Sequence, residues 1–211
     1  MRLLLHACCG PCLIEPYDAM SHEYETDVLF ANPNIHPAGE WVRRRDTLLD
    51  YAGAHGLTVI EIPQDARSWS SATAGLEDDR SRRCRACFGL RMDLTARAAA
   101  AGSYDGFATT LTVSPYQDGD SIRDAGEEAA RAHGVRYIHR DFRNRYHEAT
   151  KRARDGGMYL QNYCGCMLSS LEATREREER RHLPARCGNE LRTPAKRFDQ
   201  AEEEPVTREN R

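Results

Sequence analysis

The sequence has no run of about 18 apolar residues, the length that a membrane-spanning helix needs, so it predicts no membrane segment. Several enzyme motifs are also missing. There is no glycine-rich loop ending in Lys-Ser or Lys-Thr, no GxGxxG and no HExxH, which removes the usual phosphate-loop, dinucleotide-binding and zinc-protease signatures. Lysine occurs only at Lys151 and Lys196, so nearly all positive charge is carried by arginine.

Length and charge set broad limits. A chain of 211 residues suits one sizeable domain. The net charge of −3 neither indicates nor excludes a nucleic-acid partner. The apolar stretch at residues 1–8 is too short for a signal peptide, so we expect a cytoplasmic protein that does not bind membranes. We predict one catalytic domain over residues 1–182 and a mobile, polar tail over residues 183–211, where Cys187 has no cofactor role.

Cysteine is the residue that the sequence arranges unusually. Seven of the eight cysteines form three groups, and an odd number of thiols cannot all close into internal disulfides. In a reducing compartment, clustered thiols favour metal binding or redox chemistry. The groups are Cys8, Cys9 and Cys12; Cys84 and Cys87; and Cys164 and Cys166.

The first two groups together offer four thiolates. We expect Cys84 and Cys87 to open a helix, whose N-terminus favours thiolate. With Cys8 and Cys9 they could bind a four-iron, four-sulfur (4Fe-4S) cluster. A structural zinc site with the same four ligands is the alternative.

The late pair has a different character. Cys164 and Cys166 are separated by one glycine, so a disulfide between them would be strained and easily reduced. This spacing favours electron transfer, although both thiols could instead ligate a metal. Cys12 is left as a ligand for a further metal ion or as a reactive thiolate.

Apolar patterning predicts a three-layer α/β domain around a mostly parallel sheet. An exposed connection with a short helix is expected at residues 65–79. The expected strands are 2–7, 28–31, 57–62, 106–111 and 135–139. Gly10 and Pro11 are expected to form a turn, and the expected helices are 12–20, 39–55, 82–101, 121–133, 145–154 and 168–181.

Polar residues follow the ends of several expected strands, where ligands bind in such sheets. Asn32, Asn34 and His36 are candidate substrate contacts or a plain turn, and Asp141 is a metal ligand or a helix-start residue. Arginines near the middle cysteines, including Arg82 and Arg83, form either a solvated helix face or a surface for an anionic substrate.

Six ordered segments together resemble the cobalamin-independent epoxyqueuosine reductase family, QueH. All three cysteine groups are among them, and the segments span about residues 2–172. They are LLLHACCGPC (3–12), ANPNIHP (31–37) with EWVRRRDTLLDYA (40–52), RCRACFGLRMDLTA (83–96), FATTLTVSPYQ (107–117), RDFR (140–143) and YLQNYCGCMLSS (159–170).

The resemblance implies an α/β fold of the HUP type and removal of the epoxide oxygen of epoxyqueuosine at the tRNA wobble position, giving queuosine. It implies a 4Fe-4S cluster on Cys8, Cys9, Cys84 and Cys87, and a redox-active pair at the late cysteines. An additional mononuclear iron would use Cys12, Asp141 and a late cysteine. The partner is tRNA, and the electron donor is unknown.

Two other functions compete with this interpretation. A zinc-stabilised RNA-binding protein without catalysis would be colourless, whereas an iron–sulfur protein is brown. Another cysteine-based oxidoreductase would be inactive on tRNA that carries epoxyqueuosine.

Overall fold

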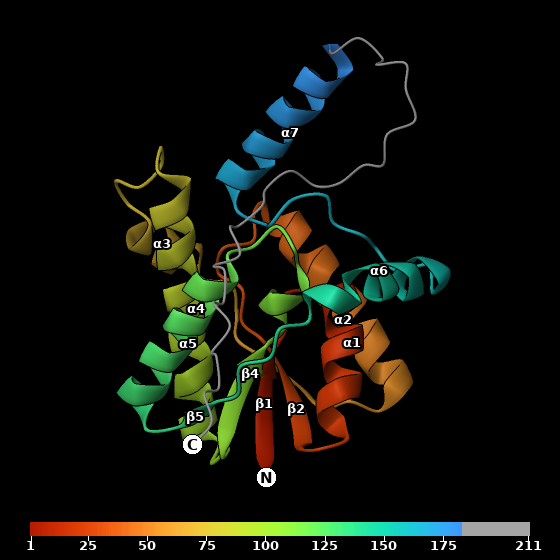
Figure 1. Ribbon diagram of the computed structural model, residues 1–211, viewed down its shortest axis with the longest axis vertical. Helices are drawn as coiled ribbons and strands as arrows, with labels where there is room; N and C mark the ends of the chain where they lie inside the picture. Colours follow the sequence, from red (N-terminus) through yellow and green to blue (C-terminus); the bar gives the residue numbers. More distant parts are fainter. Residues whose placement is uncertain (183–211) are drawn as a thin grey trace, which may run out of the picture.

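Five parallel strands form a single sheet in the order β3-β2-β1-β4-β5 in the computed structural model (Figure 1), which describes residues 1–182. The expected tail with Cys187 lies outside the described residues. The parallel sheet confirms the predicted α/β class. Its strands are β1 (Arg2–His6), β2 (Glu25–Phe30), β3 (Val59–Glu61), β4 (Gly106–Thr109) and β5 (Arg136–Tyr137).

Helices cover both faces of this sheet. On β1, Leu3 and Leu5 pack into one apolar cluster with residues of α1, α2 and α6, whereas Leu4 packs into the other with residues of α4 and α5. This alternation follows from the two-residue repeat of a strand. The helices are α1 (Gly10–Ser21), α2 (Ala38–His55), α3 (Ala66–Ala72), α4 (Arg80–Ala101), α5 (Gly119–His133), α6 (Tyr146–Asp155) and α7 (Met167–His182).

The expected elements are all present, but several boundaries differ. The strand expected at 106–111 ends at Thr109, whose hydroxyl accepts a hydrogen bond from the backbone N–H of Leu111 and starts the 3-10 turn η1 (Thr110–Val113). A second 3-10 turn, η2 (Arg143–Arg145), precedes α6. Both edge strands, β3 and β5, are shorter than expected because each pairs on only one side.

Helix α4 begins two residues earlier than expected. The side chain of Asp79 caps it by accepting a hydrogen bond from the backbone N–H of Arg82 at 3.0 Å. Cys84 therefore lies in the second turn and does not open the helix. The predicted support of its thiolate by the helix N-terminus is wrong, because the effect fades within the first turn.

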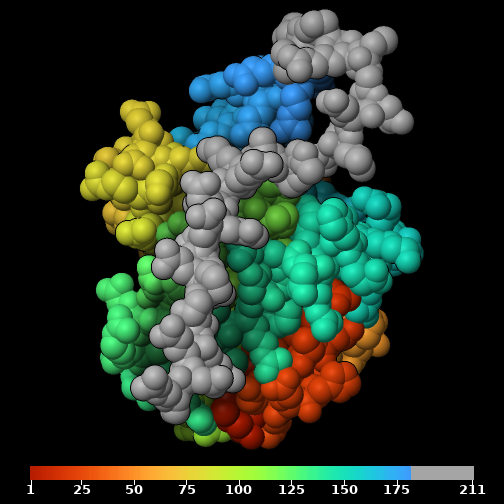
Figure 2. Space-filling model, viewed as in Figure 1, coloured from red at the N-terminus to blue at the C-terminus, as the bar shows by residue number. Residues whose placement is uncertain are grey.

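Helix α7 extends above the carboxyl edge of the sheet (Figure 1). Its first residues lie beside α3 (Figure 2), where Trp69 of α3 packs with Cys166, which directly precedes α7. The carboxyl edge is therefore covered by segments from late in the chain. None of the helices within residues 1–182 combines the length and apolar character required to cross a membrane.

Candidate active site

The carboxyl ends of the three central strands are tied together by His6, the last residue of β1. Its Nδ1 lies 2.9 Å from the hydroxyl of Thr109 at the end of β4, and its Nε2 lies 3.3 Å from the carbonyl oxygen of Ala31 after β2. Burial, followed by the positive charge of Arg91, lowers the pKa of His6 to about 3. The imidazole is therefore neutral and acts as a fixed cross-link below the cysteines.

Three thiols meet directly after β1. The sulfur atoms of Cys8, Cys9 and Cys12 all lie within 4.8 Å of one another, and those of Cys8 and Cys9 are 3.8 Å apart. Cys9 is the N-cap of α1, so the group sits at a helix N-terminus, where negative charge is favoured. Gly10 permits this packing, because a Cβ there would lie only 2.6 Å from the terminal methyl of Met158.

Among the three sulfurs, Cys8 is favoured as the thiolate, and Cys9 and Cys12 remain protonated and donate hydrogen bonds to it. Hydrogen bonds from Cys12 and Cys9 hold the pKa of the Cys8 thiol well below its usual range. The same proton sharing raises the pKa of Cys12, and burial raises that of Cys9. Sulfur donors this close can bind a metal without rearrangement of the backbone.

The middle pair borders the same region but is not part of that compact group. Cys84 packs against the apolar cluster that contains Cys8 and Cys9. Cys87 lies in a smaller cluster with Trp69 and Cys166. Burial raises the pKa of Cys84 to about 11 and also raises that of Cys87. A bound cation would be needed to keep the half-buried sulfur of Cys84 and the buried sulfur of Cys87 as thiolates.

The late pair presents one exposed and one buried thiol, both free. The amide nitrogen of Gln117 lies 4.0 Å from the sulfur of exposed Cys164. The buried sulfur of Cys166 accepts a hydrogen bond from the backbone N–H of Ser169 at 3.3 Å, at the start of α7. Burial nevertheless raises the pKa of the Cys164 thiol to about 12, so this thiol is protonated at neutral pH.

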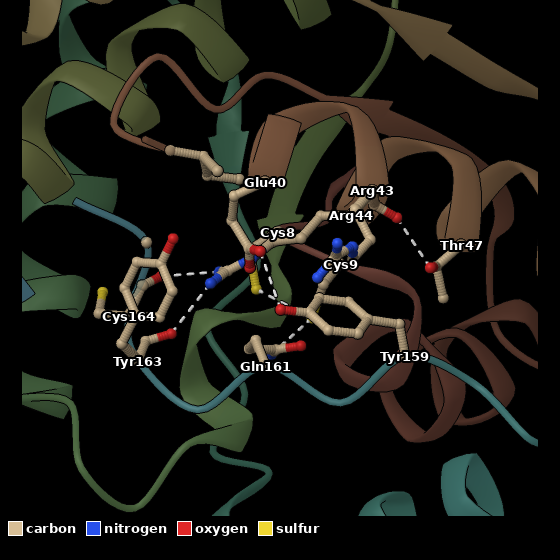
Figure 3. Close-up of polar contacts among 12 residues, drawn as sticks. Cys8, Cys9, Glu40, Arg43, Arg44, Thr47, Tyr159, Gln161, Tyr163 and Cys164 are labelled. Atoms are coloured by element: carbon tan, nitrogen blue, oxygen red, sulfur yellow. Dashed lines mark hydrogen bonds and ion pairs between the residues drawn. The ribbon is translucent and has the colours of Figure 1, made fainter. Parts of the chain in front are cut away.

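Arg44 fixes the segment that carries this pair. Its buried guanidinium pairs with Glu40 at 2.7 Å and donates to the carbonyl oxygens of Tyr163 (3.0 Å) and Cys164 (2.9 Å), as Figure 3 shows. Tyr159 donates its hydroxyl to the second oxygen of Glu40 at 2.8 Å. Helix α2 therefore holds residues 159–164 at three points.

A second anchor joins this segment to the residues after β2. The backbone N–H of His36 donates to the carbonyl oxygen of Gly165 at 2.8 Å, and Tyr163 donates its hydroxyl to the carbonyl oxygen of His36 at 2.5 Å. Gly165 has φ +137°, and a Cβ there would lie 3.1 Å from the side chain of Asn34. The glycine between the late cysteines is thus required by both conformation and space.

Gln161 connects the late segment to the first cysteine group. Its amide nitrogen donates to the sulfur of Cys9 at 2.9 Å and lies 3.7 Å from that of Cys12. Its carbonyl oxygen is buried without a hydrogen-bond partner. Unpartnered buried polar atoms around a group of thiols fit a site that receives a ligand. Others in this region are Asn34 Oδ1, His36 Nε2, Gln117 Oε1 and Arg91 Nε.

Not every predicted site residue lies with the thiols. Asn32 and Asn34 are buried, Asn34 beside Gly165, and the ring of His36 packs near Trp69. Asp141 is exposed and pairs with Arg143 at a polar cavity of about 150 Å³ that Gln117 also lines. The structure does not bring its carboxylate into the compact thiol group.

The two arginines predicted to contact the substrate, Arg82 and Arg83, differ in their exposure to solvent. Arg82 is exposed, but Arg83 is buried and pairs with Glu172 of α7. A buried guanidinium that already has a carboxylate partner cannot present itself to an external anion. The expectation that Arg83 faces a substrate is therefore corrected: its contacts fix α7 to α4.

Several site residues escaped the sequence analysis. Glu40 and Arg44 have the four-residue spacing of a helical ion pair, but the sequence does not say that the pair is buried. His6 interrupts an apolar strand, which was a usable signal. Gln161 and Arg91 carry no local signal because their partners are remote in the chain.

A family model described as epoxyqueuosine reductase QueH matches residues 3–172. The chain belongs to the QueH family. QueH of Thermotoga maritima is 30% identical over 84% of this chain and 94% of its own length. QueH of Haemophilus influenzae is 33% identical over 84% of this chain and 75% of its own length. The family predicted from the six segments is thus confirmed.

A looser likeness exists among solved structures. A predicted subunit of a tRNA methyltransferase from Methanocaldococcus jannaschii covers 84% of the QueH chain described here and 88% of its own, with 11% identity and a TM-score of 0.47. A similarity this distant carries no functional argument.

Proposed function

We propose that this protein reduces epoxyqueuosine in tRNA to queuosine at the carboxyl edge of its sheet. The observation that carries the proposal is the meeting of the first cysteine group with the late cysteine segment, through the contact of Gln161 with Cys9 and Cys12. Family membership supplies the substrate, and this junction supplies a place where thiols and a metal centre act on the same bond.

A 4Fe-4S cluster would be held by Cys8, Cys9, Cys84 and Cys87. Cys84 and the first two cysteines pack around one apolar cluster, which supports their sharing a centre. A cluster is larger than an ion, so its ligands need not all be as close as the sulfurs of Cys8, Cys9 and Cys12. Cys12 and Asp141 are kept as ligands of a second iron, the latter with the least structural support. When bound, iron supplies a Lewis acid for oxygen and a path for single electrons.

The chain's own redox step is the conversion of two thiols into a disulfide. Cys164 and Cys166 each lose a proton and together give up two electrons as their sulfur–sulfur bond forms. The epoxide loses both carbon–oxygen bonds, the two carbons become joined by a double bond, and the oxygen leaves as water with the two protons. A reductant, whose identity is open, restores both thiols after each turnover.

The tRNA must present its wobble base to this edge, where single-stranded bases can be splayed out and stacked. Tyr116 offers a ring that is 74% exposed, and it directly precedes Gln117, the neighbour of Cys164. The exposed Arg82 is a candidate contact for a nearby phosphate, and the half-buried His36 is a candidate contact for the base.

The deciding experiment uses protein purified without oxygen. We expect iron and sulfide in the sample, and conversion of epoxyqueuosine to queuosine in tRNA. Cys164→Ser should keep the iron and sulfide content while multiple turnover stops, because the disulfide cannot form. Cys187→Ser is the matched control and should keep both properties.

Three results would refute the proposal. Zinc in place of iron would favour the RNA-binding alternative. Inactivity of the iron-loaded protein on the modified tRNA would favour another thiol oxidoreductase. Normal turnover of Cys164→Ser would remove the electron-pair role.

A further inference from the structure

Three arginines are buried in residues 1–182, and one of them lacks an acidic partner there. Arg44 is 1% exposed and pairs with Glu40, and Arg83 is 2% exposed and pairs with Glu172. Arg91 is also 1% exposed, but it forms no ion pair within the described part of the chain. A guanidinium is always protonated in proteins, so this position holds a full positive charge.

The contacts of Arg91 place its charge among the cysteines. Its Nη2 donates to the side-chain oxygen of Asn32 at 2.8 Å, and the amide of Asn32 donates to the carbonyl oxygen of Ala7, which precedes Cys8, at 2.9 Å. On α4, Arg91 follows Cys87 by four residues and shares its helix face. Within residues 1–182, its Nε is buried with no hydrogen-bond partner.

A buried charge without compensation costs several kcal/mol, so a counter-charge is expected nearby. The neighbouring histidine cannot provide it, because His6 is neutral or positive. Asn32 supplies only a dipole. The remaining groups are sulfurs: Cys87 lies one helical turn before Arg91 on α4, and Cys8 follows Ala7, whose carbonyl oxygen accepts the hydrogen bond from Asn32.

We propose that Arg91 is the counter-cation of the metal–thiolate centre and sets its reduction potential. This inference rests on the proposed iron–sulfur function. The structure gives Arg91 a neutral tether, Asn32, and leaves its charge free to act on the ligands from both Cys8 and Cys87. A fixed cation stabilises the reduced, more negative form of a centre and so raises its potential.

The test is a redox titration of the cluster-loaded protein, followed by electron paramagnetic resonance, with iron counted per chain. Arg91→Gln should shift the midpoint potential to more negative values or lose iron, whereas Arg91→Lys should stay nearer to the wild type. Arg97→Gln is the control: it removes an exposed guanidinium of the same helix, away from the thiols, and the potential should not move.

Asn32→Asp gives a second route that does not remove Arg91. The new carboxylate keeps the hydrogen bond to Nη2 but neutralises the guanidinium, so the potential should again fall. If Arg91→Gln does not fold, Asn32→Asp alone decides.

A wild-type potential and iron content in Asn32→Asp, or in a folded Arg91→Gln, would overturn the inference. So would an equal shift in Arg97→Gln. If the wild-type protein itself binds no iron, the proposed iron–sulfur function is rejected. If it binds iron but the variants leave the potential unchanged, only the role of Arg91 is rejected.

Discussion

Replacing Arg44 by glutamine removes the connection between α2 and the late cysteine segment. The side chains of Arg44 and Glu40 are 1% and 7% exposed, and their closest atoms are 2.7 Å apart. Loss of one partner of a buried ion pair costs about 3–5 kcal/mol, because the other charge stays buried. Tyr159 still donates to Glu40 in the variant. We therefore expect a loss of about 3 kcal/mol, a large part of the roughly 5–15 kcal/mol that stabilises a typical domain.

Urea unfolding of the metal-free protein measures this loss. Arg43→Gln is the matched control, because Arg43 is the exposed neighbour and its guanidinium lies 4.9 Å from the ring of Tyr159. We expect the control to lose less than about 1 kcal/mol. Glu40→Gln and the double variant complete a cycle, in which the double variant should lose less than the sum of the two single variants.

The same variant should loosen residues 163–166, because the carbonyl oxygens of Tyr163 and Cys164 lose their donor. Hydrogen exchange of this segment should therefore speed up more than that of the central strands. The reasoning fails if Arg44→Gln is within 1 kcal/mol of Arg43→Gln, or if the exchange of the segment is unchanged.

Three further predictions concern other parts of the molecule. Gly165→Ala should lower the free energy of unfolding by about 1–3 kcal/mol through strain at φ +137°. The loss should exceed that of Gly157→Ala, where φ is also positive but the space around the new Cβ is open. Equal losses in urea unfolding would exclude a contribution from the contact with Asn34. Tyr104→Phe should cost about 1–3 kcal/mol at pH 7, because the hydroxyl of Tyr104 donates to Asp27 at 2.6 Å. Burial and that hydrogen bond raise the pKa of Tyr104 from 10 to about 12, so the contribution of the hydroxyl to the free energy of unfolding is complete below pH 10 and is lost as pH rises toward 12. The free energy of unfolding of the variant should therefore fall less steeply at alkaline pH than that of the wild type, and an equally steep fall would contradict this. Arg82→Glu should weaken tRNA binding and reduce its salt dependence, whereas Arg97→Glu on the same helix, away from the thiols, should not; equal effects would dismiss Arg82 as a phosphate contact.

The cysteines whose sulfurs lie closest together are not the same set as the proposed cluster ligands. The sulfurs that lie closest together are those of Cys8, Cys9 and Cys12, whereas the proposed cluster uses two of these with Cys84 and Cys87. Cys87 also packs with Cys166, so the middle pair lies between the first group and the late pair. In the proposed function, this placement would put the late pair beside a ligand of the cluster.

The sequence alone predicted the fold class well, because apolar strands buried on both faces alternate with helices of ordinary length. It predicted the cysteine groups and their approximate edge of the sheet, since Cys8 follows β1 and the carboxyl ends of parallel strands share one edge. The family was also readable, because short segments with specific spacing survive without any knowledge of contacts. Element ends were less predictable: the side-chain cap by Asp79 shifted the start of α4.

Only the tertiary structure decided which polar residues serve the site. Arg82 and Arg83 are adjacent in the chain, yet one is exposed and the other is buried against Glu172. Arg44 and Arg91 are both buried, yet only Arg44 has a carboxylate partner within residues 1–182. Local sequence determines the period and the faces of each element, whereas the burial of a charge depends on tertiary contacts, such as that between Arg83 and Glu172, which are 89 residues apart. The cysteine groups could therefore be recognised in the sequence, whereas the residues that surround them were identified only in the tertiary structure.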